Sequence, residues 1–470
     1  MSTPTTRARV SLPRPTPVQR LGLLLGSIAF LVPLLVEIPG LAPAGHRMLA
    51  IFLLAILLWV TEAIPLYATA MLVILLQVLM LSDQALVGGV GPLPSAASYF
   101  AALANPVIIL FLGGFLIADG AHKFGLDRNL AAVMLRPFAG NARTSVLGLM
   151  AITALLSMFV SNTATAATMF AVVIPILAAL PAGPARTGVA LAIPVAANVG
   201  GIGTPVGSPP NAIALGALEA SGQGVSFIGW MLLAVPLMLV VLLFAWWFLT
   251  RRYIAADTPL TLQLSADFDR SPAAILFYLI AGATVLLWLT EPFHGISSST
   301  VGFLPVVALL ATQVMGADDI RRLQWPVLWL VAGGIALGAG IGNSGLDVWL
   351  VGLVAWDALP LTLLLFLLVG VSLGLSTVIS NSATANLLVP LALSLAIGLP
   401  IDPTAVGVMV ALACALAMAL PISTPPNAVA YATGEVQTRE MVVSGIVIGG
   451  FGALLLALVM PTVWGALGLL

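Results

Sequence analysis

Hydrophobic residues fill most of the chain, in long runs that short polar or Gly- and Pro-containing segments interrupt. A transmembrane helix needs about 20 predominantly apolar residues. Runs near or above that length recur from the first half of the chain to its end. We expect membrane-spanning helices at residues 21–38, 47–60, 66–81, 106–121, 188–218, 228–250, 273–289, 301–315, 326–341, 405–433 and 441–464.

Two further apolar stretches, residues 145–180 and 361–397, are too long for one ordinary span. Each has a polar cluster at its middle, as in a helical hairpin that enters the membrane, turns and leaves on the same side. Non-helical backbone at that depth is tolerated only where protein or a water-filled cavity surrounds it. We therefore predict an all-α integral membrane protein with about eleven transmembrane helices and two re-entrant hairpins.

Composition supports burial in a lipid bilayer. Of the 470 residues, 61% are hydrophobic and 7% are charged, whereas a soluble domain has about 25% charged residues. A net charge of −1 without a basic patch gives no indication of a nucleic-acid partner. The single cysteine, Cys414, excludes a disulfide framework and a thiolate metal site. The three histidines are scattered, and we expect no organic cofactor.

Cationic residues indicate the orientation in the membrane. With the N-terminus inside and both long stretches treated as hairpins, 15 of the 16 Lys and Arg residues fall on the cytoplasmic side and only Arg47 falls outside. Treating either stretch as a single span reverses everything downstream and loses this agreement. The sequence therefore predicts a multi-pass protein of the cell membrane with an exterior C-terminus, a first hairpin opening from the cytoplasm and a second opening from the exterior.

The same reading divides the chain into four parts. These are a cytoplasmic tail at 1–20, a first half at 21–250, a cytoplasmic linker at 251–271 and a second half at 272–470. A basic N-terminus before an apolar run can be a signal peptide. Since the run leads into another membrane segment and lacks a small-residue cleavage pattern, we interpret it as a first transmembrane helix.

The two halves contain matching polar motifs. Ser157, Ser161 and Asn162 in the first stretch correspond to Ser376, Ser380 and Asn381 in the second. A Pro-Pro-Asn segment follows each motif, ending at Asn211, 49 positions after Asn162, and at Asn427, 46 positions after Asn381. By the charge rule the halves have opposite orientation. Inverted repeats with interrupted helices at corresponding positions, here about 188–218 and 405–433, indicate the midplane site of a secondary transporter.

The residue types of each motif can bind a small cation and one end of an anion. Hydroxyl and amide oxygens are neutral cation ligands, and Asn and Thr also donate hydrogen bonds. Four residues apart, Ser157 and Ser161 would share one helical face, as would Ser376 and Ser380. The Pro-Pro pairs prevent a regular helix and free the carbonyls before them, and a half-helix that begins after the break presents its positive end.

Charges are nearly absent around both motifs. Arg186 is the only charged residue between Arg143 and Glu219, and Asp402 is the only one between Asp357 and Glu435. Without an intramembrane Lys or Arg, a bound dianion needs another source of positive charge. Co-transported sodium ions would supply it.

Each polar feature also has a purely structural interpretation. A lone Ser or Thr in a membrane helix usually bonds its own backbone, and Gly200, Gly201 and Gly203 could simply permit close helix contact. Glu62 fits a structural carboxylate near a helix end better than a proton carrier. A proton relay through Asp119 and His122 has no further support in the sequence. Repetition of the whole motif in both halves favours the transport site over packing alone.

At these residues the chain resembles the divalent anion:sodium symporter family, the sodium-coupled dicarboxylate carriers, over nearly its whole length. The resemblance implies an elevator-type ion-transporter fold and a homodimer, with a scaffold domain at the interface and a moving transport domain. It rests on Trp59-Val-Thr-Glu62-Ala-Ile-Pro-Leu, Ser161-Asn-Thr163, Gly207-Ser-Pro-Pro-Asn-Ala-Ile-Ala, Ser380-Asn-Ser382 and Ser423-Thr-Pro-Pro-Asn-Ala.

The resemblance also implies roles by position. A first sodium site would use Ser157, Ser161, Asn162 and the Gly207 carbonyl, and a second would use Ser376, Ser380, Asn381 and the Ser423 carbonyl. The anion would contact Asn162 and Thr163 at one end and Asn381 and Ser382 at the other, with Ser208, Thr424 and Pro425 lining the pocket. Ser382 departs from the Thr usual in close dicarboxylate carriers, and Ser423 adds a hydroxyl at a position often small and apolar.

The function expected from these features is sodium-coupled uptake of a C4-dicarboxylate such as succinate, malate or fumarate. Exchange of one dicarboxylate for another, or transport of sulfate or citrate, fits the same fold. A membrane enzyme would need a nucleophile with a base or a metal cluster, and the expected spans contain neither. A channel would lack coupling. We therefore expect a transporter and not an enzyme.

Overall fold

The computed structural model describes residues 15–88, 93–255, 258, 266–353, 359–397 and 401–469. Most of the expected N-terminal tail and part of the expected linker at 251–271 lie outside the described residues. The described chain is helical, as predicted. In the first half the helices are α1 (Pro17–Leu35), α2 (Pro43–Thr61), α3 (Leu66–Leu81), α4 (Ala96–Phe100), η1 (Ala101–Ala104), α5 (Pro106–Lys123), α6 (Leu126–Leu135), η2 (Arg136–Phe138), α7 (Ala142–Ser157), α8 (Asn162–Ala179), α9 (Pro184–Gly200), η3 (Pro205–Gly207), α10 (Pro209–Ala220) and α11 (Phe227–Tyr253).

The second half repeats the order of long helix, short connecting helix, helix pair and interrupted helix. Its helices are α12 (Pro272–Leu289), α13 (Glu291–His294), α14 (Ser298–Ala311), α15 (Ala317–Arg322), α16 (Trp325–Asn343), α17 (Leu346–Gly352), α18 (Leu361–Val378), α19 (Asn381–Ile397), α20 (Pro403–Ala415), α21 (Pro425–Ala432), α22 (Thr438–Leu458) and α23 (Met460–Ala466).

Among the described residues, nine helical segments are long and apolar enough to cross a membrane. Shorter apolar helices accompany them, among them α3 and α14, which were expected to be spans. Residues 66–81 form a helix with the predicted bounds. An all-helical membrane protein is thus confirmed.

Both over-long apolar stretches fold as pairs of helices joined by a very short connection. In the first pair, α7 ends at Ser157 and α8 begins at Asn162, and in the second α18 ends at Val378 and α19 begins at Asn381. The two helices of each pair contact one another. Each polar motif therefore lies at the tip of a pair, which is where the sequence predicted a turn.

Both predicted broken helices are interrupted. Between α9 and α10 the chain leaves the helix after Gly200, makes a short 3-10 turn and resumes at Pro209. Between α20 and α21 it leaves after Ala415 and resumes at Pro425. Proline suits the first position of a helix because its missing N–H would have no partner there. The Pro-Pro pairs thus restart the helices that the preceding segment interrupts.

Helices α6 and α17 are among the short helices that were not predicted from the sequence. Each follows a glycine with a left-handed backbone, Gly125 at φ 62° and Gly345 at φ 69°. Each then begins with Leu-Asp, at Leu126-Asp127 and Leu346-Asp347. They connect the preceding long helix to the helix pair in both halves. Because they are short, they carry no apolar run that a search for spans would detect.

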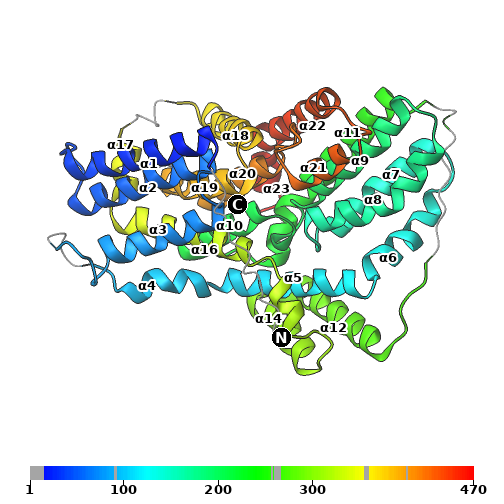
Figure 1. Cartoon of the computed structure of the whole chain (residues 1–470), viewed down its shortest axis with the longest axis horizontal. Helices are drawn as coiled ribbons and strands as arrows, with labels where there is room; N and C mark the ends of the chain where they lie inside the picture. Colours follow the sequence, from blue (N-terminus) through cyan, green and yellow to red (C-terminus); the bar gives the residue numbers. More distant parts are fainter. Residues whose placement is uncertain are drawn as a thin grey trace, which may run out of the picture.

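Figure 1 shows α1, α2 and α3 at one end of the molecule and α7 and α8 towards the other, with α10, α16, α19 and α20 in the middle. Helix α9, the first part of an interrupted helix, is deeply buried, since every residue from Gly188 to Gly200 is buried. Helix α10 contacts α20, α19 and α16 of the second half. The interrupted helices of both halves thus form one core.

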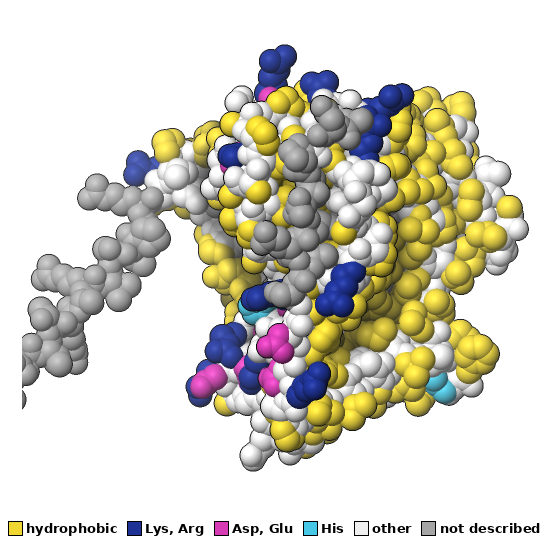
Figure 2. Space-filling view, turned by 90° about the vertical axis from the view of Figure 1, so that its right-hand side faces the viewer, with side chains coloured by type: hydrophobic (Ala, Val, Ile, Leu, Met, Phe, Trp, Pro, Cys, Tyr) yellow, Lys and Arg dark blue, Asp and Glu magenta, His cyan; other side chains and the backbone are white. Residues whose placement is uncertain are grey.

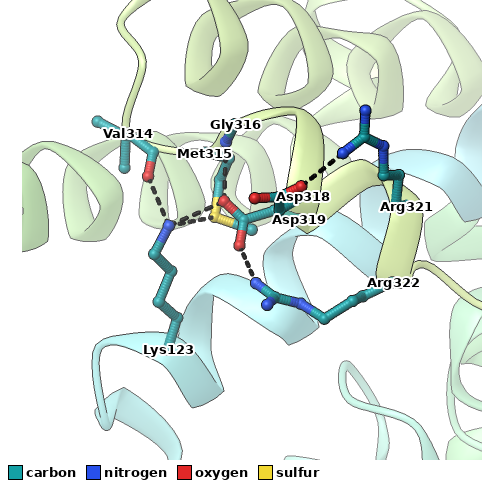
Figure 3. A network of polar contacts seen from close by, with 8 residues as sticks. All are labelled: Lys123, Val314, Met315, Gly316, Asp318, Asp319, Arg321 and Arg322. Carbon is teal, nitrogen blue, oxygen red and sulfur yellow. Dashed lines mark hydrogen bonds and ion pairs between the residues drawn. The ribbon is translucent and has the colours of Figure 1, made fainter. Parts of the chain in front are cut away.

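A charged network joins the end of α5 to the second half. Lys123 Nζ lies 2.8 Å from Asp319 Oδ2 in α15 and donates to the Val314 carbonyl at 3.1 Å (Figure 3). The Gly316 N–H donates to the same carboxylate at 2.8 Å, and Arg322 pairs with its other oxygen at 2.5 Å. Burial alone would raise the pKa of Asp319, but the hydrogen bonds from Lys123 and Gly316 outweigh it and lower the pKa below its ordinary value.

Candidate functional site

Both Ser-Asn motifs and both Pro-Pro-Asn segments border one cavity of about 450 Å³ in the middle of the molecule. The cavity brings together the tips of the two helix pairs and the N-terminal ends of α10 and α21. Its lining includes the predicted anion-contacting residues Asn162, Thr163, Ser208, Asn381, Ser382, Thr424 and Pro425. Residues more than 200 positions apart in the sequence thus meet at one site.

The first motif forms a cluster of oxygen atoms beside this cavity. Ser157 is fully buried, and its Oγ lies 2.6 Å from Asn162 Oδ1 and 2.8 Å from the Ala197 carbonyl oxygen. The same end of the Asn162 amide faces the carbonyl of Gly207. With Nδ2 turned to this side, the amide would donate to the Gly207 carbonyl at 3.0 Å and to the Ala197 carbonyl at 3.3 Å.

The second motif repeats this geometry. Ser376 is also fully buried, and its Oγ lies 2.8 Å from Asn381 Oδ1 and 2.9 Å from the Cys414 carbonyl oxygen. The equivalent helix ends, α9 and α20, supply the carbonyls in the two clusters. The sequence could not indicate these two carbonyls, because any residue has one and only the fold brings it to the motif.

With the asparagine Oδ1 turned inward, each cluster has more oxygen acceptors than hydrogens, whereas the reversed Asn162 amide would supply hydrogens to the first cluster. A serine hydroxyl carries one hydrogen, yet Ser157 and Ser376 each face two acceptors. With Oδ1 inward, Asn162 and the carbonyls add lone pairs and no hydrogen. A cation in the middle would satisfy such a set of oxygens, and it would also hold the Asn162 amide with Oδ1 towards the cluster. These neutral oxygens are ligands suited to sodium.

One prediction about the motif is wrong. Ser157 and Ser161 do not share a helical face, and neither do Ser376 and Ser380, because the first helix of each pair ends before the second serine. Instead Ser161 Oγ accepts from the Ala164 N–H at the start of α8, at 3.3 Å, and Ser380 Oγ accepts from the Ala383 N–H at 3.2 Å. Both serines cap the second helix of their pair, as serine commonly does.

Gly201 permits this arrangement. A β-carbon at Gly201 would collide with the Oδ1 and Nδ2 atoms of Asn162. The glycine lies immediately after α9, with ordinary right-handed backbone angles. Its role is therefore steric: the absence of a side chain gives the Asn162 amide its place.

The asparagines of the Pro-Pro-Asn segments hold the interrupted backbone. Asn211 Nδ2 donates to the carbonyls of Gly201 and Thr204 at 2.9 and 2.8 Å. Asn427 Nδ2 donates to the carbonyls of Met418 and Leu420 at 2.7 and 3.0 Å. Both asparagines are buried. The sequence marked them as part of a repeated motif but gave them no role, and the structure assigns them to the support of the site.

Asn198 is a site residue that the sequence did not reveal. It lies in α9, is 1% exposed and borders the cavity. Its Nδ2 lies 3.1 Å from Thr424 Oγ1 and 3.1 Å from Asn427 Oδ1. It therefore bonds the first half of the chain directly to the interrupted helix of the second half.

The remaining walls of the cavity are mostly apolar. They come from α3, α5 and the start of α16, including Tyr67, Phe111 and Phe115. Gln324, just before α16, approaches Ser161 Oγ at 3.4 Å. None of the residues that the structure places around the cavity carries a charge. The described lining thus offers neutral dipoles and no charged side chain.

Glu62 and His122, two groups considered in the sequence, have local structural contacts. Glu62 ends α2 in a left-handed conformation, with φ 46°, and its carbonyl accepts from Gln19 Nε2 at 3.1 Å. His122, which is largely exposed, approaches Asp127 at 3.4 Å. Glu62, Asp119 and His122 all lie outside the lining of the cavity.

The chain is similar to known membrane transporters. The sequence profile of the citrate transporter family matches residues 56–413 and 285–468. A sodium-dependent dicarboxylate transporter of Staphylococcus saprophyticus is 30% identical, over 94% of this chain and 90% of that protein. A sodium-dependent dicarboxylate transporter of Staphylococcus aureus is 29% identical, over 95% of this chain and 92% of its own.

Solved structures with a similar fold are also membrane proteins. The YdaH transporter of Alcanivorax borkumensis is 17% identical, with a TM-score of 0.54 over 86% of this chain and 98% of that structure. MtrF of Neisseria gonorrhoeae, from a class of antimetabolite efflux pumps, is 11% identical, with a TM-score of 0.52 over 86% of this chain and 96% of its own. The family resemblance read from the motifs is confirmed: the chain belongs to the citrate transporter family of membrane transporters.

Proposed function

We propose that this protein is a secondary active transporter that uses a sodium gradient to take up a divalent anion, a C4-dicarboxylate such as succinate, malate or fumarate. The observation that carries the proposal is the pair of matching oxygen clusters beside one uncharged cavity. The names of the Staphylococcus relatives, sodium-dependent dicarboxylate transporters, support both the ion and the substrate class.

Each cluster would bind one sodium ion. The first ion would be held by Ser157 Oγ, Asn162 Oδ1 and the Gly207 carbonyl, which face one another in the structure. The second would be held by Ser376 Oγ, Asn381 Oδ1 and the Ser423 carbonyl. Ser161 and Ser380, expected as further ligands, both cap their helices, and Ser161 Oγ also accepts from Gln324 Nε2 at 3.4 Å, a contact that an ion at Ser161 would have to displace. In both clusters the ion would be coordinated by lone pairs of neutral oxygen atoms.

The anion would lie between the two helix-pair tips. Asn162 and Thr163 begin α8, and Asn381 and Ser382 begin α19. Each helix presents unpaired N–H groups and the positive end of its dipole to the cavity, so each carboxylate would meet one helix start. Ser208, Thr424 and Pro425 would form the sides. Two sodium ions would balance the charge of a dianion that no cationic side chain pairs with.

The matching helix order of the two halves fits inverted repeats in an elevator-type carrier. The helix pairs and interrupted helices of both halves form the core around the cavity, and we propose that they move together against a scaffold of the other helices in a homodimer. Lys and Arg side chains spread over the end of the molecule seen in Figure 2, as the charge rule expects of a cytoplasmic face. The N-terminus would then be cytoplasmic and the C-terminus exterior, in the cell membrane.

Uptake into proteoliposomes tests the proposal. Labelled succinate should accumulate above equilibrium with an inward sodium gradient, and an inward potassium gradient should not replace it. Uptake that is indifferent to sodium contradicts sodium coupling. Uptake that needs unlabelled dicarboxylate inside the vesicles instead indicates an exchanger. Competition by citrate and sulfate decides the anion, and saturable counterflow distinguishes a carrier from a channel.

A further inference from the structure

We propose that Asn198 couples the two sodium clusters, so that occupation of one favours occupation of the other. This inference rests on the proposed sodium coupling and adds a residue and a regulatory property to it. Asn198 follows Ala197, whose carbonyl belongs to the first cluster. Asn198 thus lies in α9 next to a residue of the first cluster, and it contacts Asn427, which supports the loop at the second cluster.

A continuous chain of contacts leads from Asn198 to the second cluster. Asn198 donates to Asn427 and Thr424, and Asn427 in turn donates to the Met418 and Leu420 carbonyls. The Leu420 carbonyl accepts from the Ser423 N–H at 3.1 Å, and Ser423 Oγ accepts from the Leu420 N–H at 3.1 Å. The position of the Ser423 carbonyl therefore depends on a loop that Asn198 helps to hold.

The second half has no equivalent contact. The two clusters align Ala197 with Cys414, so the residue that corresponds to Asn198 is Ala415. An alanine cannot donate to Asn211, and Asn211 Oδ1 is indeed buried without a hydrogen-bond partner. The corresponding Asn427 Oδ1 accepts from Asn198 at 3.1 Å. The otherwise matching halves thus share a single direct bond of this kind, contributed by the first half.

This bond can transmit the effect of ion binding. A sodium ion at the first cluster would fix the Ala197 carbonyl, the end of α9 and the adjacent Asn198 side chain. The loop that Asn427 holds would then be ordered before the second ion arrives. Binding of the second ion would therefore lose less conformational entropy. Coupling between sites commonly changes affinity by about 5- to 150-fold. Uptake that requires two bound ions is sigmoidal in sodium even without coupling, so the expected consequence of coupling is a steeper sigmoid with a higher Hill coefficient.

The test compares initial rates of succinate uptake in proteoliposomes across external sodium concentrations. The main variant is Asn198→Leu, which keeps the branched shape and the number of side-chain heavy atoms and removes the amide. The matched control is Thr187→Val, which removes another bond from α9 to the second half, from Thr187 Oγ1 to the Glu435 carbonyl at 3.0 Å. Thr187 lies eleven residues before Asn198, roughly 16 Å along the helix at about 1.5 Å per residue.

We expect a Hill coefficient for sodium that approaches 2 in the wild-type protein and in Thr187→Val, and a clearly lower one in Asn198→Leu, with a half-saturating sodium concentration at least about 5-fold higher. If Asn198→Leu does not fold, Asn198→Ser, which is too short to span the same contacts, takes its place. An unchanged Hill coefficient in the variant overturns the coupling alone, as does a hyperbolic sodium response in the wild type. A wild type without any sodium response overturns the proposed function as well.

Discussion

Gly201 and Asn162 lie so close that no β-carbon fits between them. We predict that Gly201→Ala nearly abolishes sodium-driven uptake, because the added methyl group displaces the amide from Ser157 and Gly207. Initial uptake rates in proteoliposomes measure the effect. Gly374→Ala is the matched control, since a β-carbon at Gly374 in α18 meets nothing within 4 Å. Uptake in Gly201→Ala close to that of the control would show that the amide does not need this position.

Removal of either cluster asparagine should stop transport without unfolding the protein. Asn162→Ala and Asn381→Ala each delete an oxygen of one cluster and the group that begins α8 or α19. We expect no sodium-dependent succinate uptake in either variant and an unchanged elution volume in size-exclusion chromatography. Retained uptake in either variant would exclude the corresponding cluster from the transport site.

Asn427 should matter for stability as well as for transport. In Asn427→Ala the Met418 carbonyl loses its side-chain donor inside the core, and the Leu420 carbonyl and the Asn198 amide each lose one of two partners. A buried group left without a hydrogen bond costs about 1–3 kcal/mol. We expect the melting temperature in detergent to fall by several degrees. Asn343→Ala is the control, because Asn343 is exposed at the end of α16. Equal melting of the two variants would contradict the structural role of Asn427.

Ser382 provides a test of anion selectivity. Ser382→Thr adds a methyl group at the wall of the cavity and leaves the hydroxyl in place. A methyl-sized change in a pocket alters discrimination by about 10- to 200-fold. We expect citrate to compete less well against succinate uptake than in the wild type, because it is the larger anion, while succinate uptake itself persists. Stronger competition by citrate would indicate that the anion does not approach this wall.

Asp319 predicts how stability responds to acid. Its folded-state pKa is lowered by its hydrogen bonds, so its contribution is present above the ordinary carboxyl pKa and is lost as pH falls through the lowered value. We expect Asp319→Asn to have a lower melting temperature than the wild type at pH 7, and we expect this difference in melting temperature to become smaller below about pH 4.

Asp318→Asn serves as the neighbouring control for that measurement. Asp318 pairs with Arg321, and both side chains are more than three-quarters exposed (Figure 3). Exposed ion pairs contribute little, so this variant should melt like the wild type at both pH values. A difference for Asp319→Asn that stays constant with pH would contradict the role of its charge.

Much of the fold was predictable because apolar runs and proline positions determine where helices lie. The bounds of α3 and the turn inside each over-long stretch follow from these signals. Helices α6 and α17 were missed because they are short and lack a full span. The turn itself was foreseen, but the helix was assumed to continue from Ser157 to Ser161. Serine caps the next helix equally well, and spacing alone does not distinguish the two arrangements.

The site was predictable only where the two halves repeat one another. Asn162 and Asn381 could be identified because the same motif occurs in both halves of the sequence. Asn198 has no counterpart, since Ala415 takes its place, and a lone asparagine in an apolar helix resembles an ordinary packing residue. The carbonyls of Ala197 and Cys414 have no signature in the sequence. Such contributions depend on the three-dimensional path of the backbone.

The absence of charged side chains around the cavity also determines which forms of the proposed carrier can cross the bilayer. An empty site carries no net charge, and neither does a site holding two sodium ions and one dianion. A site holding only the anion, or only the ions, would bring an uncompensated charge into a medium of low dielectric constant, where charge transfer is strongly unfavourable. Loaded and empty carriers would therefore move freely while half-loaded ones stall, and the membrane itself would enforce the stoichiometry.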